Sequence, residues 1–114
     1  MIPIDATQWS EFTRRFSHEH DGWSAAVQVR GSDGAVDVAV EDRPFRGVTF
    51  EKRGGHAVVI LSFGDDPEEH LAHIVEHPQA LSLLDHHPRE CSLVIGLADG
   101  SGCVLELDSP FHAD

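Results

Sequence analysis

The sequence has few basic residues and no cluster of them. Only 8 of its 114 residues are Lys or Arg, against 20 Asp and Glu, and the formal net charge is −12. The longest basic runs are two pairs, Arg14-Arg15 and Lys52-Arg53. Because a phosphate backbone is bound by clustered Lys and Arg, this composition argues against a nucleic-acid partner. The same negative charge opposes contact with anionic lipid surfaces.

Long apolar runs and paired-cysteine motifs are also missing. No apolar run approaches the ~20 residues that a membrane-spanning helix needs, so we expect no membrane association. Residues 1–5 have neither a basic start nor a long apolar stretch, and we therefore expect no signal peptide. The two cysteines, Cys91 and Cys103, are not part of a CxxC motif. We expect two reduced, mostly buried thiols in a cytoplasmic protein.

Signatures of the common enzyme classes are absent as well. The sequence has no GxSxG nucleophile elbow, no GxxxxGKS/T phosphate loop and no GxGxxG dinucleotide motif. No acid, base and nucleophile can be combined from the spacing of the remaining residues. The sequence therefore favours a protein that is not an enzyme, and it indicates no catalytic residue.

What is present is enough apolar sequence for one core. Apolar residues make up 40% of the chain, and domains typically contain ~100–150 residues. We therefore expect one domain over residues 1–114.

The clearest local pattern lies near the N-terminus. Asp5 stands where a helix cap is expected. Trp9, Phe12 and Phe16 follow at the spacing of one helical face. The pattern predicts a helix over about residues 6–20, with an aromatic stripe that packs into the core.

Most of the remaining chain has strand patterns separated by turns. Apolar alternation or continuous apolar sequence predicts strands at 23–30, 36–41, 48–51, 56–63, 80–84, 93–97 and 104–107. Pro44 is expected to break the chain between two of them. If Asp99-Gly100 forms a two-residue turn, Cys103 faces Gly96.

These elements together predict an α+β fold. The N-terminal helix packs on a twisted antiparallel sheet of about six strands. Short turns between consecutive strands favour a meander, and the sheet can curl toward a half-open barrel that hides its edges.

The segment 67–76 fits two structures. Asp66-Pro67-Glu68-Glu69 is typical of a helix start, and a short second helix over 67–76 is the first choice. Pro78 would end it. The alternative is a single turn at 67–70, followed by a strand through Ile74-Val75.

Histidines cluster in and after this segment. In a helix, His73 and His77 would lie one turn apart and could share a divalent metal, with Glu69 or His70 as a third ligand. In a strand, His70 and His73 would point to opposite faces, and the cluster would dissolve. A solvated His-rich face is the competing interpretation. A divalent metal is the only cofactor that the sequence suggests.

Two stretches carry a resemblance to a known family. The N-terminal stretch contains Ile2-Pro3-Ile4-Asp5, Trp9, Phe12, Phe16-Ser17, His20 and Gly22-Trp23. It resembles the opening of small bacterial proteins in a domain-of-unknown-function family. The run His70-Leu71-Ala72-His73-Ile74, followed by Pro78, resembles a second motif of that family. The resemblance spans Ile2 to about Pro110. It implies a bacterial origin and a free-standing domain, and it carries no catalytic residue over.

Two classes of function follow. The first is a non-enzymatic interaction or assembly module, a homodimer that forms through an exposed strand edge or the helix. The second is a metal- or small-ligand-binding protein that uses His70, His73 and His77, with Glu69 as a helper.

Overall fold

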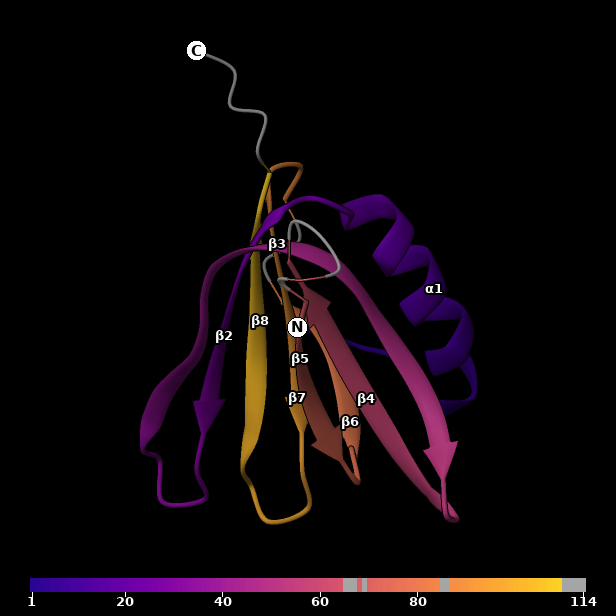
Figure 1. Ribbon diagram of the computed structural model, residues 1–114. Coiled ribbons are helices and arrows are strands. Elements are labelled where there is room, and N and C mark those ends of the chain that lie inside the picture. Colours follow the sequence, from indigo (N-terminus) through magenta and orange to yellow (C-terminus); the bar gives the residue numbers. More distant parts are fainter. Residues whose placement is uncertain (65–67, 69, 85–86, 110–114) are drawn as a thin grey trace.

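Eight strands and an N-terminal helix form the part of the chain that the computed structural model describes, residues 1–64, 68, 70–84 and 87–109 (Figure 1). The elements in chain order are β1 (Ile2–Pro3), the 3-10 turn η1 (Ala6–Gln8), α1 (Trp9–His20), β2 (Ser24–Arg30), β3 (Val36–Arg53), β4 (His56–Phe63), β5 (Leu71–Glu76), β6 (Ala80–Leu84), β7 (Glu90–Gly96) and β8 (Gly102–Asp108). All strands belong to one antiparallel sheet, in the order β1-β6-β7-β8-β2-β3-β4-β5.

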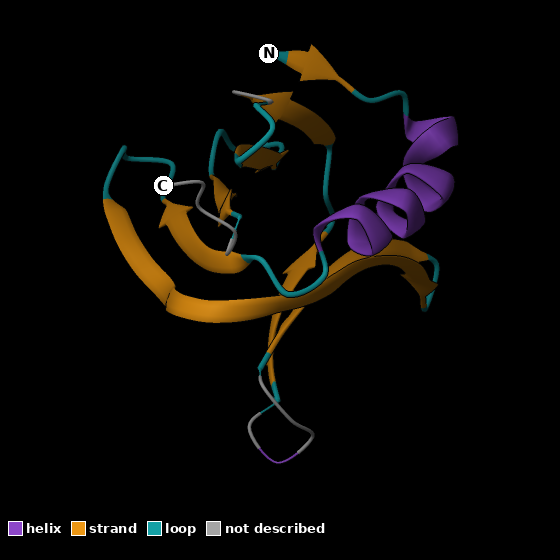
Figure 2. Cartoon of the chain, turned by 90° about the horizontal axis from the view of Figure 1, so that it is seen from above, coloured by secondary structure: helices purple, strands orange, loops and turns teal. Residues whose placement is uncertain are grey.

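The predicted α+β fold with about six strands is therefore wrong. The described residues form mostly sheet, with eight strands and one α-helix. The meander holds only in two parts, β2 to β5 and β6 to β8, because β8 pairs with β2 and thereby joins them. Seen from above, the sheet curves around the core, and α1 lies along one side of it (Figure 2).

Residues 71–76 of the segment predicted as a second helix form strand β5. Strand β5 pairs with β4 from Phe63↔Leu71 to Val58↔Glu76. Pairing with this apolar neighbour overrides the local helix signal, because strand formation depends on packing across the sheet. The alternative prediction of a strand through Ile74-Val75 is confirmed, whereas residues 67 and 69 lie outside the described part.

Strand β3 is longer than predicted, because Pro44 does not interrupt it. The first half of β3 pairs with β2 as far as Ser24↔Pro44, and the second half pairs with β4 from Phe45↔Phe63. A register shift between Phe45 and Gly47 accompanies the change of partner. Bulges of this kind bend a strand and increase its twist. The bent β3 leads from one part of the sheet into the other (Figure 2).

The N-terminal helix and its aromatic stripe are confirmed. The carboxylate of Asp5 accepts a hydrogen bond from the Thr7 N–H at 2.9 Å. Trp9 and Phe16 are buried, and Phe12 is partly buried against the same core. Because α1 and η1 are contiguous, they cover the predicted range 6–20.

The helix packs its aromatic rings edge-on against β3. The Trp9 and Phe50 rings have centroids 5.6 Å apart, and those of Phe16 and Phe45 are 6.0 Å apart. Both pairs are T-shaped. The helix therefore lies against the second half of β3, and this position creates the groove described below.

The β7–β8 hairpin differs from the predicted one by a single residue. The Leu97 N–H donates to the Ser101 carbonyl at 2.9 Å, which leaves a loop of three residues in place of two. Cys103 consequently pairs with Ile95 and not with Gly96. Both cysteines are buried and free.

Candidate functional site

The residues predicted as a metal site are spread out in the described structure. His70 is exposed and precedes β5, whereas His73 lies on β5 opposite Leu61. A strand advances ~3.3 Å per residue, so His73 and His77 are separated by roughly 13 Å along the chain and not by one helical turn. Glu69 lies outside the described part. The described residues contain no group of three or more His, Cys, Asp or Glu side chains that could hold a metal ion.

The titration of His73 is altered by its position on β5. Its side chain shares a face of β5 with the core residue Val75. Burial lowers the pKa of His73 below its usual value of 6.5. Because a neutral imidazole is easier to bury than a charged one, the partly buried position beside the core favours the neutral form of His73.

His77 stacks on a histidine that the sequence analysis did not single out. The rings of His56 and His77 have centroids 4.4 Å apart, and the Nε2 of His56 lies 3.7 Å from the Oε1 of Glu76. The His77 N–H donates to the Ala57 carbonyl at 3.0 Å. The Gly54-Gly55 turn joins β3 to β4 and places His56 at the start of β4, but the contact with His77 depends on the pairing of β4 with β5, for which the sequence carries no such signal. These contacts of His56, Ala57, Glu76 and His77 join the end of β5 to the start of β4.

The hydrogen bond from the His77 N–H to the Ala57 carbonyl shows which backbone groups of β5 point away from β4. Ala57 and His77 form a hydrogen-bonded pair, and such pairs alternate with non-bonded ones along an antiparallel ladder. Leu71, His73 and Val75 therefore direct their N–H and C=O groups toward β4. The groups of the intervening residues, Ala72, Ile74 and Glu76, lie along the outer edge of the sheet, since β5 is its last strand.

Apolar side chains accompany this free edge. Ile74 is 50% exposed and Leu71 is 40% exposed. Ile74 is paired with the half-buried Ile60 of β4. Among the described residues no strand pairs with this edge, which thus combines free backbone groups with exposed apolar side chains.

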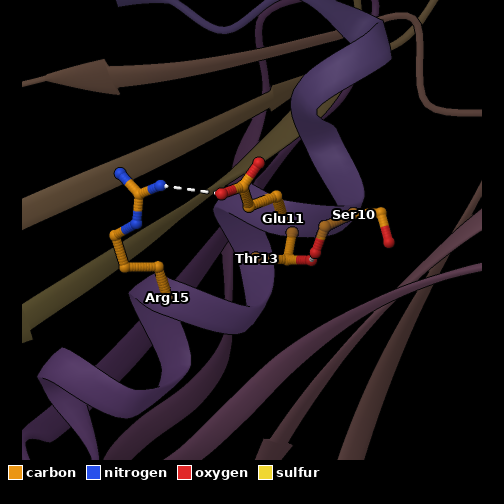
Figure 3. A network of polar contacts seen from close by, with 4 residues as sticks. All are labelled: Ser10, Glu11, Thr13 and Arg15. Atoms are coloured by element: carbon orange, nitrogen blue, oxygen red, sulfur yellow. Dashed lines mark hydrogen bonds and ion pairs between the residues drawn. The ribbon is translucent and has the colours of Figure 1, made fainter.

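A groove of about 370 Å³ lies between α1 and the second half of β3. One face of α1 and three consecutive residues of β3 line it: Ser10, Thr13, Arg14, Ser17, Val48, Thr49 and Phe50. Figure 3 shows the helix side of this region, where Thr13 donates a hydrogen bond to the Ser10 carbonyl and Arg15 pairs with Glu11 at 3.2 Å. Within the described structure, the neighbouring Arg14 has no such ion pair.

The helix closes this groove at one end. The Val48 N–H donates to the Ser17 hydroxyl at 2.8 Å, and the same hydroxyl lies 2.9 Å from the Val48 carbonyl oxygen. The helix can come this close because residue 47 is glycine: a Cβ there would lie 3.3 Å from the Ser17 Oγ. Ser17 thus occupies the place beside Val48 that a neighbouring strand would take.

Comparison with protein families gives one match over the whole chain. DUF5335, a family of unknown function, matches residues 1–114. The chain belongs to this family. The resemblance to a family of unknown function is confirmed, and membership supplies no residue roles. A comparison with curated proteins gives no match, and neither does a comparison with solved structures. In the described residues, no helix is long and apolar enough to cross a membrane.

Proposed function

We propose that this DUF5335 chain is a non-enzymatic assembly module that forms a homodimer through the free edge of β5. One observation carries the proposal, the contrast between the two ends of the sheet. At one end, β1 is two residues long and includes Pro3, which has no N–H to offer. At the other end, β5 has six residues and contains no Pro, Gly or Lys. Proteins commonly protect a free edge by such residues or by keeping the strand short.

The free groups of β5 are suited to pairing with a second copy. In an antiparallel pair centred on Ile74, this residue would exchange both hydrogen bonds with Ile74 of the second copy. Ala72 would pair with Glu76 of the second copy in the same way. All of these residues have their N–H and C=O groups on the free edge. The two glutamates then lie at opposite ends of the seam, so that like charges are kept apart.

The apolar side chains support the same arrangement. Side chains directly opposite in an antiparallel pair have Cβ atoms ~4.5–5.5 Å apart. The two Ile74 side chains would therefore contact each other at the centre, beside Ile60 of each copy. A twofold interface of this kind uses the same surface on both subunits.

The net charge and the cysteines support the kind of partner and the cellular compartment that we propose. A net charge of −12 favours a protein partner over a polynucleotide. Unpaired, buried Cys91 and Cys103 are what a reducing compartment maintains, and we place the protein in the bacterial cytoplasm. The alternative of a metal-binding protein lacks a suitable side-chain group in the described residues.

Sedimentation velocity of the wild-type protein and two lysine variants tests the proposal. At ~100 μM, a concentration well above the Kd of most specific pairs, we expect a dimer for the wild type and a monomer for Ile74→Lys. Val36→Lys is the matched control, because Val36 is also 50% exposed but lies at the start of β3. Circular dichroism checks that both variants fold. A monomeric wild type, or equal effects of the two substitutions, would contradict the proposal.

A further inference from the structure

We propose that the groove between α1 and β3 binds the carboxy-terminal end of an extended peptide, which adds to β3 as an antiparallel strand. This site is separate from the edge of β5 and does not depend on dimer formation. Three features of the groove lead to this ligand: unpaired backbone groups, a closed end and an unpaired cation.

The unpaired backbone groups belong to the second half of β3. Pairing with β2 ends at Pro44, so no strand in the described structure covers the other side of β3 beyond that point. Val48 directs its N–H and C=O to Ser17 and therefore away from β4. Because the ladder from Val48 to Arg53 is regular, alternation gives the groups of Phe50 and Lys52 the same direction. An extended peptide can pair with these groups, as in strand addition to other sheet edges.

The closed end of the groove sets the direction of the peptide. Trp9 at the start of α1 contacts Phe50, whereas Ser17 near the end of α1 contacts Val48. The helix therefore runs antiparallel to β3, and the two elements meet at Gly47. A strand that pairs antiparallel to β3 enters beside Lys52 and runs toward this closed end. Its chain has to stop there, so the residue at the closed end is its last one.

An unpaired cation is available for the terminal carboxylate. Arg14 lines the groove one helical turn before Ser17, and its guanidinium has no ion pair among the described residues. The adjacent Arg15 is already paired with Glu11. Arginine binds carboxylates through two parallel hydrogen bonds, which are stronger than neutral ones. The exposed hydroxyl of Ser10 lies on the same face of α1 and adds a donor along the groove.

Two random heptapeptide pools test this proposal. One pool is immobilised at the N-terminus and ends in a free carboxylate, and the matched pool ends in an amide. We expect the wild-type protein to bind members of the carboxylate pool. Their amide counterparts should bind at least about tenfold more weakly, which is the cost of one charge-assisted hydrogen bond. No binder in the carboxylate pool, or equal binding of the amides, would overturn the proposal.

Matched substitutions identify the groove as the site. Arg14→Ala should weaken binding of the selected peptides about tenfold or more, and Arg15→Ala should leave it within about twofold. Lys52→Pro removes an N–H that faces the groove, whereas Lys52→Thr retains it. Only the proline variant should therefore lose affinity. Identical behaviour within either pair would contradict the site.

A further variant separates this proposal from the dimer. Ile74→Lys changes the edge of β5 and should bind the selected peptides as the wild type does. Loss of peptide binding in Ile74→Lys would show that the site requires the dimer and would contradict an independent groove.

Discussion

A single hydroxyl group lies beside the backbone of Val48 in place of a strand. The Ser17 hydroxyl accepts from the Val48 N–H at 2.8 Å, and its one proton is shared between the Thr13 carbonyl at 2.7 Å and the Val48 carbonyl at 2.9 Å. Val48 is 3% exposed, and its N–H loses its hydrogen-bond acceptor when the Ser17 hydroxyl is removed. A buried polar group without a partner costs ~1–3 kcal/mol. We therefore expect Ser17→Ala to reduce the free energy of unfolding by ~1–3 kcal/mol, measured by urea denaturation.

Ser10→Ala is the control for this prediction. Ser10 lies on the same face of α1 but is exposed, and within the described structure its hydroxyl makes no hydrogen bond. Exposed substitutions of this kind usually change stability by less than ~0.5 kcal/mol. Equal losses for both variants would mean that helix propensity, and not the contact with Val48, explains the effect.

His73 should make stability depend on pH in mildly acidic solution. Burial lowers its pKa from 6.5 in the folded protein, so the unfolded chain binds this proton more readily. Stability is then retained above pH 6.5 and decreases as the pH falls from 6.5 toward the lowered pKa of the folded state. The measurement is the urea midpoint between pH 7.5 and ~5.5, a range that spans the usual pKa of histidine.

The contribution of His73 is isolated by substitution. His73→Gln should show a weaker pH dependence than the wild type, whereas His18→Gln, which changes an exposed residue of α1, should not. If both variants keep the wild-type pH dependence, burial of His73 is not its cause.

At the scale of elements, the sequence predicts best where one element alone produces the pattern. The aromatic stripe of α1 is such a local signal, and it is confirmed. Leu71–Glu76 carries two patterns at once, and its structure is decided by the neighbouring strand β4. Pro44 fails as a strand breaker for a similar reason, since it lies where β3 changes partners and the ladder is irregular.

The direction of the hydrogen bonds in β5 can be tested with proline. Val75 directs its N–H toward β4, whereas Ile74 directs its N–H toward the free edge. Val75→Pro should therefore lose a ladder hydrogen bond and destabilise the fold strongly. Ile74→Pro should remain folded and lose the dimer, since proline is tolerated on edge strands. Thermal unfolding and sedimentation measure the two effects, and the reverse order of stability would contradict the assigned register.

The groove and the free edge of β5 could not be predicted from the sequence, because both depend on where the pairing between strands ends. The sequence analysis named an exposed strand edge but could not say which strand provides it. The helix face with Ser10, Arg14 and Ser17 has no recognisable motif. It becomes a groove only because β2 pairs with β3 no farther than Pro44. The predicted metal site assumed a helix over 67–76, of which residues 71–76 form strand β5.

At the scale of the whole molecule, charge should govern how tightly two copies associate. Each copy carries −12, and full protonation of nine histidines would reduce this to −3. Raising the salt concentration shortens the Debye length from ~10 Å at 0.1 M to ~3 Å at 1 M, which screens the repulsion. We expect the dimer Kd to decrease from 0.1 M to ~1 M NaCl and from pH 7.5 to ~6, measured by sedimentation equilibrium.

Ile74→Lys separates this effect from general loss of solubility. The variant should stay monomeric at high salt, because its seam is disrupted whatever the charge of the surroundings. Association of Ile74→Lys at 1 M NaCl, or a dimer Kd that rises with salt, would contradict the expected role of repulsion.

The position of β8 in the sheet has a consequence for synthesis of the chain. Ala26 of β2 pairs with Glu106 of β8, and Cys91 of β7 pairs with Leu107 of β8. A nascent chain that has not yet exposed residues 102–108 outside the ribosome can form β2–β5 and β1-β6-β7 only as two separate sheets. Strand β8, the last of the described strands to be translated, joins these two parts, so the native sheet can close only after residues 102–108 have been synthesised.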